Sequence, residues 1–158
     1  MTDTDALHRL LDLEAIRRLK HRYVRCMTQS RWDEMATLLT PDVKTSYSDG
    51  KYSFDNRADL MRFLRGSHDV TQTHVLGYWL VTMPEIDVVS DTEATGIWAM
   101  YHFYLDKPAL QQQEMCAYYE DLYRKVDGRW LIAATGYRRV MEQAWSRRDI
   151  PSMELLAG

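Results

Sequence analysis

The spacing of apolar residues changes near residue 71, and this change most constrains the fold. Residues 5–29 carry apolar side chains at helical spacing. Beyond residue 71 the apolar residues alternate with a period of two, which is typical of strands. Helices that come first and strands that come last predict an α+β domain, with the helices packed on one side of a sheet. The predicted strands are 73–83, 93–105, 115–126 and 130–145.

Local signals place two further helices. A short helix is predicted over 32–39, and we expect Pro41 to stop it. Another helix is predicted over 57–65, with Asn56 as its N-cap and Gly66 at its end.

Turn residues indicate how the strands connect. Residues 42–48 alternate as a strand, and Asp127-Gly128 predicts a tight hairpin. Gly136 interrupts the last run, as a bulge in a strongly curved sheet would. We therefore expect one domain over residues 1–158: a curved, mostly antiparallel sheet closed by three N-terminal helices into a cone. The interior of that cone is the natural ligand cavity.

Composition excludes several functional classes. A net charge of −3 over 158 residues gives no reason to expect a nucleic-acid partner, and the basic cluster at 17–22 is interpreted as a solvated helix face. Cys26 and Cys116 stand alone, which predicts buried thiols in a reducing compartment. A polar N-terminus and the lack of a long apolar run predict a cytoplasmic protein with no membrane partner.

Two histidines and three tyrosines are candidate proton-transfer groups. His74 lies in an apolar segment, and a histidine near its usual pKa is the common general base or acid. His102 shares a predicted strand face with Trp98 and can divide acid and base roles with His74. Tyr23, Tyr47 and Tyr119 can each supply a phenol to a carbonyl oxygen or a leaving hydroxide. Each of these residues is also compatible with a structural role in the core, which is the more common role for a lone strand histidine such as His74 and for a helix tyrosine such as Tyr23.

Arg139 has two interpretations, and other site chemistries lack support. Its guanidinium can bind a carboxylate on a ligand or pair with an internal acid such as Glu120 or Asp121. Metal-ligand spacing, a glycine-rich phosphate loop and a serine nucleophile elbow are missing from the sequence. The sequence therefore predicts neither a metal nor a cofactor.

Several motifs, taken in order, resemble the SnoaL-like group of the nuclear transport factor 2-like superfamily. The likeness extends from Leu13 to Asp149, and it implies a cystatin-like α+β barrel. Within the group the chain looks most like the bile-acid 7α-dehydratases, and more distantly like the scytalone dehydratases. The wider motifs are Arg22-Tyr23, Trp32-Asp33, 39–43, His74, 119–121 and 126–130; the bile-acid motifs are 23–26, 45–51, 92–98 and 135–139.

The resemblance implies roles for individual residues. His74 would be the general base, and Tyr23 and Tyr47 would line the active site. Arg139 falls on a pocket arginine. Thr28 stands where the family has the aspartate that holds the histidine, and His102 stands where the bile-acid enzyme has an aspartate.

These expectations converge on a cofactor-independent dehydratase. It would remove water from a hydroxylated steroid or similar polycyclic ketone, with Thr28, Trp98, Tyr119 and Arg139 contacting the substrate. The alternatives are a ketosteroid-type isomerase in the same pocket and a non-catalytic binder of a small apolar ligand. The resemblance also implies a homo-oligomer, with a trimer favoured over a dimer.

Overall fold

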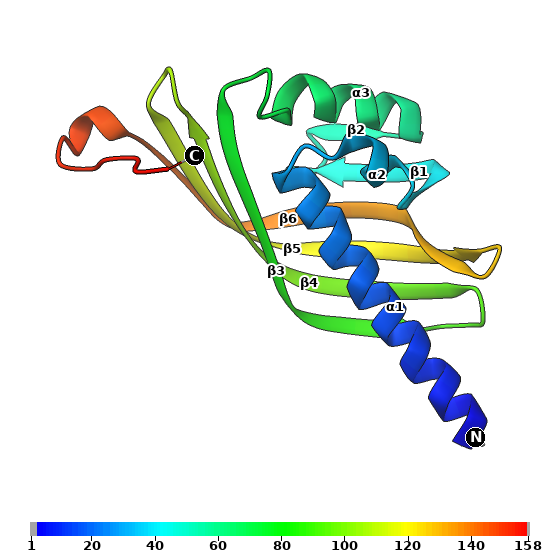
Figure 1. Cartoon of the computed structure of the whole chain (residues 1–158). Coiled ribbons are helices and arrows are strands. Elements are labelled where there is room, and N and C mark those ends of the chain that lie inside the picture. The colour runs from blue at the N-terminus through cyan, green and yellow to red at the C-terminus, as the bar shows by residue number, and fades with distance from the viewer. Residues whose placement is uncertain (1–2, 158) are drawn as a thin grey trace.

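Figure 1 shows the computed structural model of the chain, which describes residues 3–157. Three helices and six strands confirm the predicted α+β class. No helix in this part of the chain is long and apolar enough to cross a membrane. The helices are α1 (Asp3–Thr28), α2 (Trp32–Ala36) and α3 (Arg57–His68), with a 3-10 turn, η1 (Arg147–Asp149), near the C-terminus. The strands are β1 (Leu39–Tyr47), β2 (Tyr52–Phe54), β3 (Val75–Val88), β4 (Glu93–Asp106), β5 (Gln111–Val126) and β6 (Arg129–Ser146).

The strands form one curved sheet in the order β2-β1-β6-β5-β4-β3. Neighbouring strands are antiparallel except β1 and β6, which pair in parallel. In Figure 1, α1 crosses the concave face of the sheet, while α3 lies over the β1–β2 end. The concave face therefore looks toward the helices, and the space between them holds the core.

A buried ion pair fixes α1 on the sheet. Lys20 was expected on a solvated helix face, but its side chain is fully buried. Its ammonium lies 2.8 Å from Asp121 Oδ2 on β5. The expectation was wrong because Lys20 shares the inner side of α1 with Ile16 and Tyr23, which are also fully buried.

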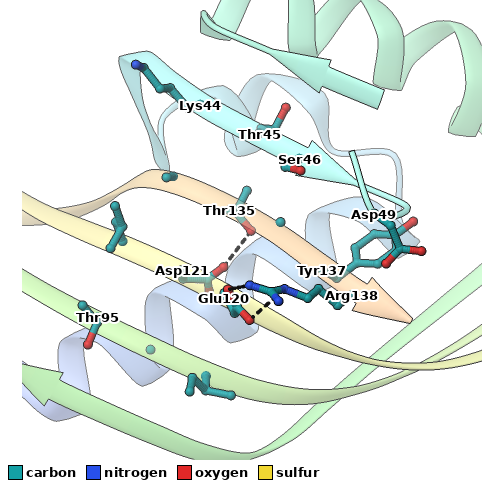
Figure 2. Close-up of a pocket in the computed structure, with 15 residues that line it drawn as sticks. Lys44, Thr45, Ser46, Asp49, Thr95, Glu120, Asp121, Thr135, Tyr137 and Arg138 are labelled. Atoms are coloured by element: carbon teal, nitrogen blue, oxygen red, sulfur yellow. Dashed lines mark hydrogen bonds and ion pairs between the residues drawn. The ribbon is translucent and has the colours of Figure 1, made fainter. Parts of the chain in front are cut away.

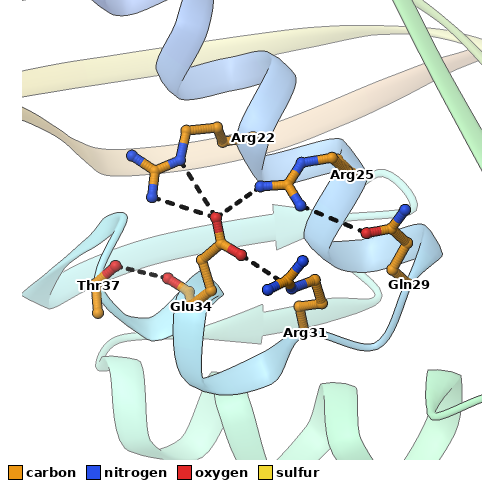
Figure 3. A network of polar contacts seen from close by, with 6 residues as sticks. All are labelled: Arg22, Arg25, Gln29, Arg31, Glu34 and Thr37. Atoms are coloured by element: carbon orange, nitrogen blue, oxygen red, sulfur yellow. Dashed lines mark hydrogen bonds and ion pairs between the residues drawn. The ribbon is translucent and has the colours of Figure 1, made fainter.

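The end of α1 is tied to α2 by charge. Figure 3 shows Arg22, Arg25 and Arg31 arranged around the carboxylate of Glu34. Their guanidinium nitrogens lie 3.2, 2.6 and 3.0 Å from it. All three arginines are at least two-fifths exposed, so each contact contributes little to stability. Together they orient the turn between the two helices.

Two expected helix ends were wrong. The third helix does not stop at Gly66 but continues to His68, and nothing lies within 4 Å of a Cβ placed at Gly66. Pro41 does not follow a helix either: it lies inside β1, in the stretch between Leu39 and Lys44 where the pairing with β6 shifts register. A proline fits there because an irregular ladder does not require its N–H. The predicted N-cap is confirmed, since Asn56 Oδ1 accepts from the Asp59 N–H at 2.9 Å.

The turn at 127–128 is confirmed, but the bulge at Gly136 is not. Asp127 and Gly128 have φ values of +49° and +75°, as a tight hairpin turn requires. The β5–β6 ladder shifts register at two other places, and Gly136 itself is regularly paired with Glu120 and Ser46. A Cβ at Gly136 would lie 2.5 Å from the Ser46 carbonyl oxygen. Glycine is needed here because β1 approaches closely.

This close approach makes a matched pair of glycine substitutions informative. Gly136→Ala should lower the free energy of unfolding by about 1–3 kcal/mol, since backbone of β1 must move to admit the methyl group. Gly66→Ala is the control: it adds the same methyl group in open space within a helix, and should raise stability by up to about 1 kcal/mol. Urea denaturation followed by circular dichroism measures both. Equal effects of the two changes would contradict the packing argument.

Candidate active site

The sheet has a hollow on each face, and only the inner one holds histidines. The outer hollow has a volume of about 750 Å³ and is drawn in Figure 2. Its charged groups include the Arg138–Glu120 ion pair, whose side chains are both more than half exposed. It contains no imidazole, so it offers little for acid–base chemistry near neutral pH.

The inner pocket has a volume of about 620 Å³ and lies between the concave face, α1 and α3. Its wall combines aromatic rings, two imidazoles and a rim of charged side chains. This mixture suits a ring-bearing organic ligand with a few polar groups. Lining residues include Phe63, His68, Trp79, His102, Tyr104, Met115, Tyr119, Tyr137 and, among the charged groups, Lys51, Arg139 and Glu142.

Four of the predicted site residues line this pocket. They come from four different strands: Tyr47 from β1, His102 from β4, Tyr119 from β5 and Arg139 from β6. The predicted alternation of β4 explains one placement, because Trp98 and His102 occupy the same inner face. The curvature of the sheet then brings the four strands around a single space.

A hydrogen-bonded tyrosine pair forms part of the pocket wall. The hydroxyl groups of Tyr23 and Tyr47 lie 2.7 Å apart, and Tyr47 reaches the pocket while Tyr23 stands behind it. Burial holds the pKa of each phenol well above its usual value. Both groups therefore keep their protons. Because one hydroxyl donates to the other, the pair retains one hydrogen that can be donated to a ligand oxygen.

His102 is a neutral imidazole with an unused nitrogen. Its ring stacks on Trp79 with 4.4 Å between ring centroids. Burial, followed by the nearby His68, lowers the pKa of His102 to about 3. Its buried Nε2 has no hydrogen-bond partner among the described residues. Such an atom costs stability, and a role toward a ligand is one established reason for a protein to keep one.

His68 and Trp79 belong to this site but were missed in the sequence. The His68 ring lies 5.6 Å from the Trp79 ring, and burial lowers its pKa to about 4. A signal was present: Leu60, Leu64 and His68 follow one another at four-residue spacing, so they share a face of α3. The helix was expected to end at Gly66, so His68 was not recognised as part of this helix face.

His74, the residue expected to act as general base, lies outside the pocket. It precedes β3 in a left-handed backbone conformation with φ +56°, and its side chain is exposed. It is not among the residues that line the inner pocket. The side chain on β3 that does reach the pocket is Trp79, five positions further along.

Thr28 and Trp98 lie next to the pocket rather than in its wall. The Thr28 hydroxyl accepts from the backbone N–H of Trp79 at 3.5 Å, so it connects the end of α1 to β3. Trp98 is fully buried and donates from Nε1 to the Tyr123 hydroxyl at 2.9 Å. Both residues support the pocket from behind.

Of the two interpretations of Arg139, the structure supports pairing with an internal acid, but the acids are not the expected Glu120 or Asp121. Its guanidinium contacts Asp49 and Glu142, each at 2.7 Å. Glu120 instead pairs with Arg138, and Asp121 pairs with Lys20. Within residues 3–157, no three His, Cys, Asp or Glu side chains are grouped to hold a metal ion.

Comparison with known proteins gives the family. The profile of the SnoaL-like domain matches residues 8–136, and the chain therefore belongs to the SnoaL-like domain family. Among solved structures, it is similar to a protein of Novosphingobium aromaticivorans named as a candidate scytalone dehydratase. That likeness has a TM-score of 0.78 and 24% identity, and it covers 90% of this chain and 91% of the other.

Two further structures support the fold. A type 3 hexachlorocyclohexane dehydrochlorinase, LinA, from Novosphingobium barchaimii has a TM-score of 0.78 and 16% identity, over 97% of this chain and 99% of that one. A protein of Novosphingobium aromaticivorans described as nuclear transport factor 2-like with a cystatin-like fold has a TM-score of 0.73 and 16% identity, over 89% and 90% of the two chains. The expected fold is confirmed, and identities this low show the fold alone.

The two buried imidazoles predict a specific loss of stability in mild acid. Their pKa values are about 4 for His68 and about 3 for His102 in the folded chain, against 6.5 for an ordinary histidine. The unfolded chain takes up protons first as pH falls from about 6.5 to about 4. Stability should therefore drop in this window by up to ~1.4 kcal/mol per pH unit for each histidine.

Denaturant titrations between pH 7 and pH 4 measure this loss. His68→Gln and His102→Gln should each flatten the decline, and the double variant should flatten it most. Curves that stay parallel to that of the wild type would show that these imidazoles are not buried in the neutral form.

Proposed function

We propose that this chain is a lyase-type enzyme that removes water from a hydroxylated polycyclic ketone, such as a steroid, by proton transfer. The observation that carries the proposal is the neutral His102 imidazole, with an unpartnered ring nitrogen, in the wall of an aromatic pocket. Membership of the SnoaL-like family supports it, because the similar structures named above include a candidate scytalone dehydratase and a dehydrochlorinase.

The pocket can hold and activate such a substrate without a cofactor. Aromatic rings, among them Phe63, Trp79 and Tyr119, present flat apolar surfaces to a ring system. The Tyr23–Tyr47 pair can donate its free hydrogen to the ketone oxygen and stabilise the negative charge that develops there. A neutral imidazole can then take the proton from a carbon that the ketone acidifies.

A direct assay tests this proposal. Purified protein is incubated with hydroxylated 3-oxo-steroids while a new conjugated-dienone absorbance is followed, and mass spectrometry checks for the loss of one water. His102→Gln should lower kcat by roughly 10²-fold, because it removes the imidazole whose unpartnered Nε2 can hydrogen-bond the reacting substrate. Tyr47→Phe should lower kcat by a similar factor through loss of one hydrogen bond in the transition state.

Tyr118→Phe is the matched control, because Tyr118 lies on the outer face of β5 and is 47% exposed. It should leave turnover unchanged. A shift of the double bond without loss of mass would instead show an isomerase. Steroid binding with no chemical change would show a non-catalytic binder, which is the outcome most consistent with Thr28 in place of the family carboxylate.

We also propose that the outer face of the sheet joins copies of the chain, as a trimer. Large apolar side chains are exposed on it, including Tyr78, Leu80, Ile97 and Leu122, each at least two-fifths exposed. Exposed apolar surface of this kind marks interaction sites.

Light scattering should give a trimer mass for the wild type and a lower mass for Leu122→Lys. Leu7→Lys, on exposed α1, is the control; an unchanged mass for Leu122→Lys would contradict the proposal.

A further inference from the structure

The end of α3 contains a short hydrogen-bond chain that fixes the tautomer of His68. Ser67 Oγ donates to the Phe63 carbonyl oxygen at 2.7 Å. The same Oγ lies 2.6 Å from His68 Nδ1. A hydroxyl has one hydrogen, and the carbonyl can only accept, so that hydrogen belongs to the contact with Phe63. The contact with His68 then requires a hydrogen on Nδ1, which leaves the lone pair on Nε2.

We propose that His68 is the general base of this pocket, with Ser67 as the residue that holds its ring. This inference rests on the proposed function, and it assigns the proton-accepting atom as His68 Nε2. Ser67 is a positioning residue, since it acts only through the imidazole.

The surroundings of His68 suit this role. The residue lines the pocket, and its ring contacts Phe63 and Trp79 at centroid distances of 6.1 and 5.6 Å. The Trp79 ring also stacks on His102, so it places the two imidazoles on one aromatic platform. A Cβ at Gly77 would lie 2.7 Å from the Trp79 ring, which shows that Gly77 leaves the space the ring occupies.

The His68 imidazole is neutral because it is buried. Burial lowers the pKa of His68 to about 4, so the lone pair is available at neutral pH. Apart from its tyrosines, the other titratable groups of the wall are His102 on β4, which is also neutral, and the rim groups Lys51, Arg139 and Glu142. The Glu142 carboxylate forms an ion pair with Arg139, with 2.7 Å between Arg139 Nη1 and Glu142 Oε2.

The reaction balances without a further reactant. His68 Nε2 forms an N–H bond as the C–H bond of the acidified carbon breaks, and the electron pair moves into the conjugated enolate. As the enolate collapses, a carbon–carbon double bond forms, the C–O bond to the hydroxyl breaks and hydroxide departs. The His68 imidazolium returns its proton to this hydroxide, which leaves as water. The ring is again neutral, with its hydrogen on Nδ1.

Two histidine variants distinguish His68 from His74 as the general base. His68→Gln keeps a polar side chain of similar size and should lower kcat at least roughly 10²-fold. His74→Gln should leave kcat within about twofold, because His74 is exposed outside the pocket. Ser67→Ala should lower kcat more than it changes KM, and Ser67→Thr, which restores the hydroxyl, should recover activity. Circular dichroism melting verifies that each variant is folded.

Nitrogen-15 NMR of histidine-labelled protein tests the geometry without any substrate. The His68 signal, identified by its loss in His68→Gln, should show a neutral ring protonated on Nδ1. Ser67→Ala should shift this ring toward the Nε2–H form.

The outcomes distinguish the two levels of the proposal. An Nε2–H ring at His68, or turnover that survives His68→Gln, overturns the role of His68 alone. Loss of activity in His74→Gln with full activity in His68→Gln returns the general base to His74. A wild-type protein that converts no hydroxylated 3-oxo-steroid overturns the proposed function, and the role of His68 in that reaction with it.

Discussion

The buried pair of Lys20 and Asp121 is the contact on which the rest of the site depends. A charge without water is costly, and only complete pairing and hydrogen bonding compensate for it. Asp121 meets that requirement, because it accepts from the Lys20 ammonium and from the hydroxyls of Tyr123 and Thr135 at 2.6 and 2.7 Å. These contacts join α1, β5 and β6 at one point. They fix the helix over the sheet, and Tyr23 follows three residues further along the same helix face.

The same pair shapes the electrostatics of the pocket. The Lys20 ammonium lies 3.5 Å from the centre of the Tyr119 ring, and Tyr119 also lines the pocket. Burial lowers the pKa of Lys20, while the charge of Asp121 opposes that effect. Burial, with a smaller contribution from the charge of Asp121, raises the pKa of Tyr23 and of Tyr47, so both phenols stay protonated. The inner wall is thus made of neutral phenols and neutral imidazoles, so the charge that matters is the one that forms on the ligand.

Local sequence patterns predicted the fold well, and contacts between distant segments account for what they missed. The period change at residue 71, the Asn56 cap and the Asp127-Gly128 turn depend on neighbouring residues alone, and each is present. Burial of Lys20 depends on Asp121, which is 101 residues away in the sequence. A glycine is needed at position 136 because the backbone of Ser46 lies too close for a Cβ. The alternation of β4 placed His102 correctly. Motif likeness singled out His74, whereas the length of α3 decides that His68 enters the pocket.

The position of Thr28 now has a physical interpretation. The resemblance expects a carboxylate there to hold an imidazole; in this chain the Thr28 hydroxyl binds the β3 backbone, and Ser67 contacts the pocket imidazole instead. A serine can fix a tautomer, but unlike a carboxylate it cannot raise the pKa of the ring by opposite charge. An imidazole held in this way is a weak base, and its protonated form is poorly stabilised in a buried pocket. It can act only on a carbon whose proton is already acidic, and it must release that proton quickly. A ketone conjugated to the reacting carbon satisfies the first condition, and a leaving hydroxide in the same pocket satisfies the second.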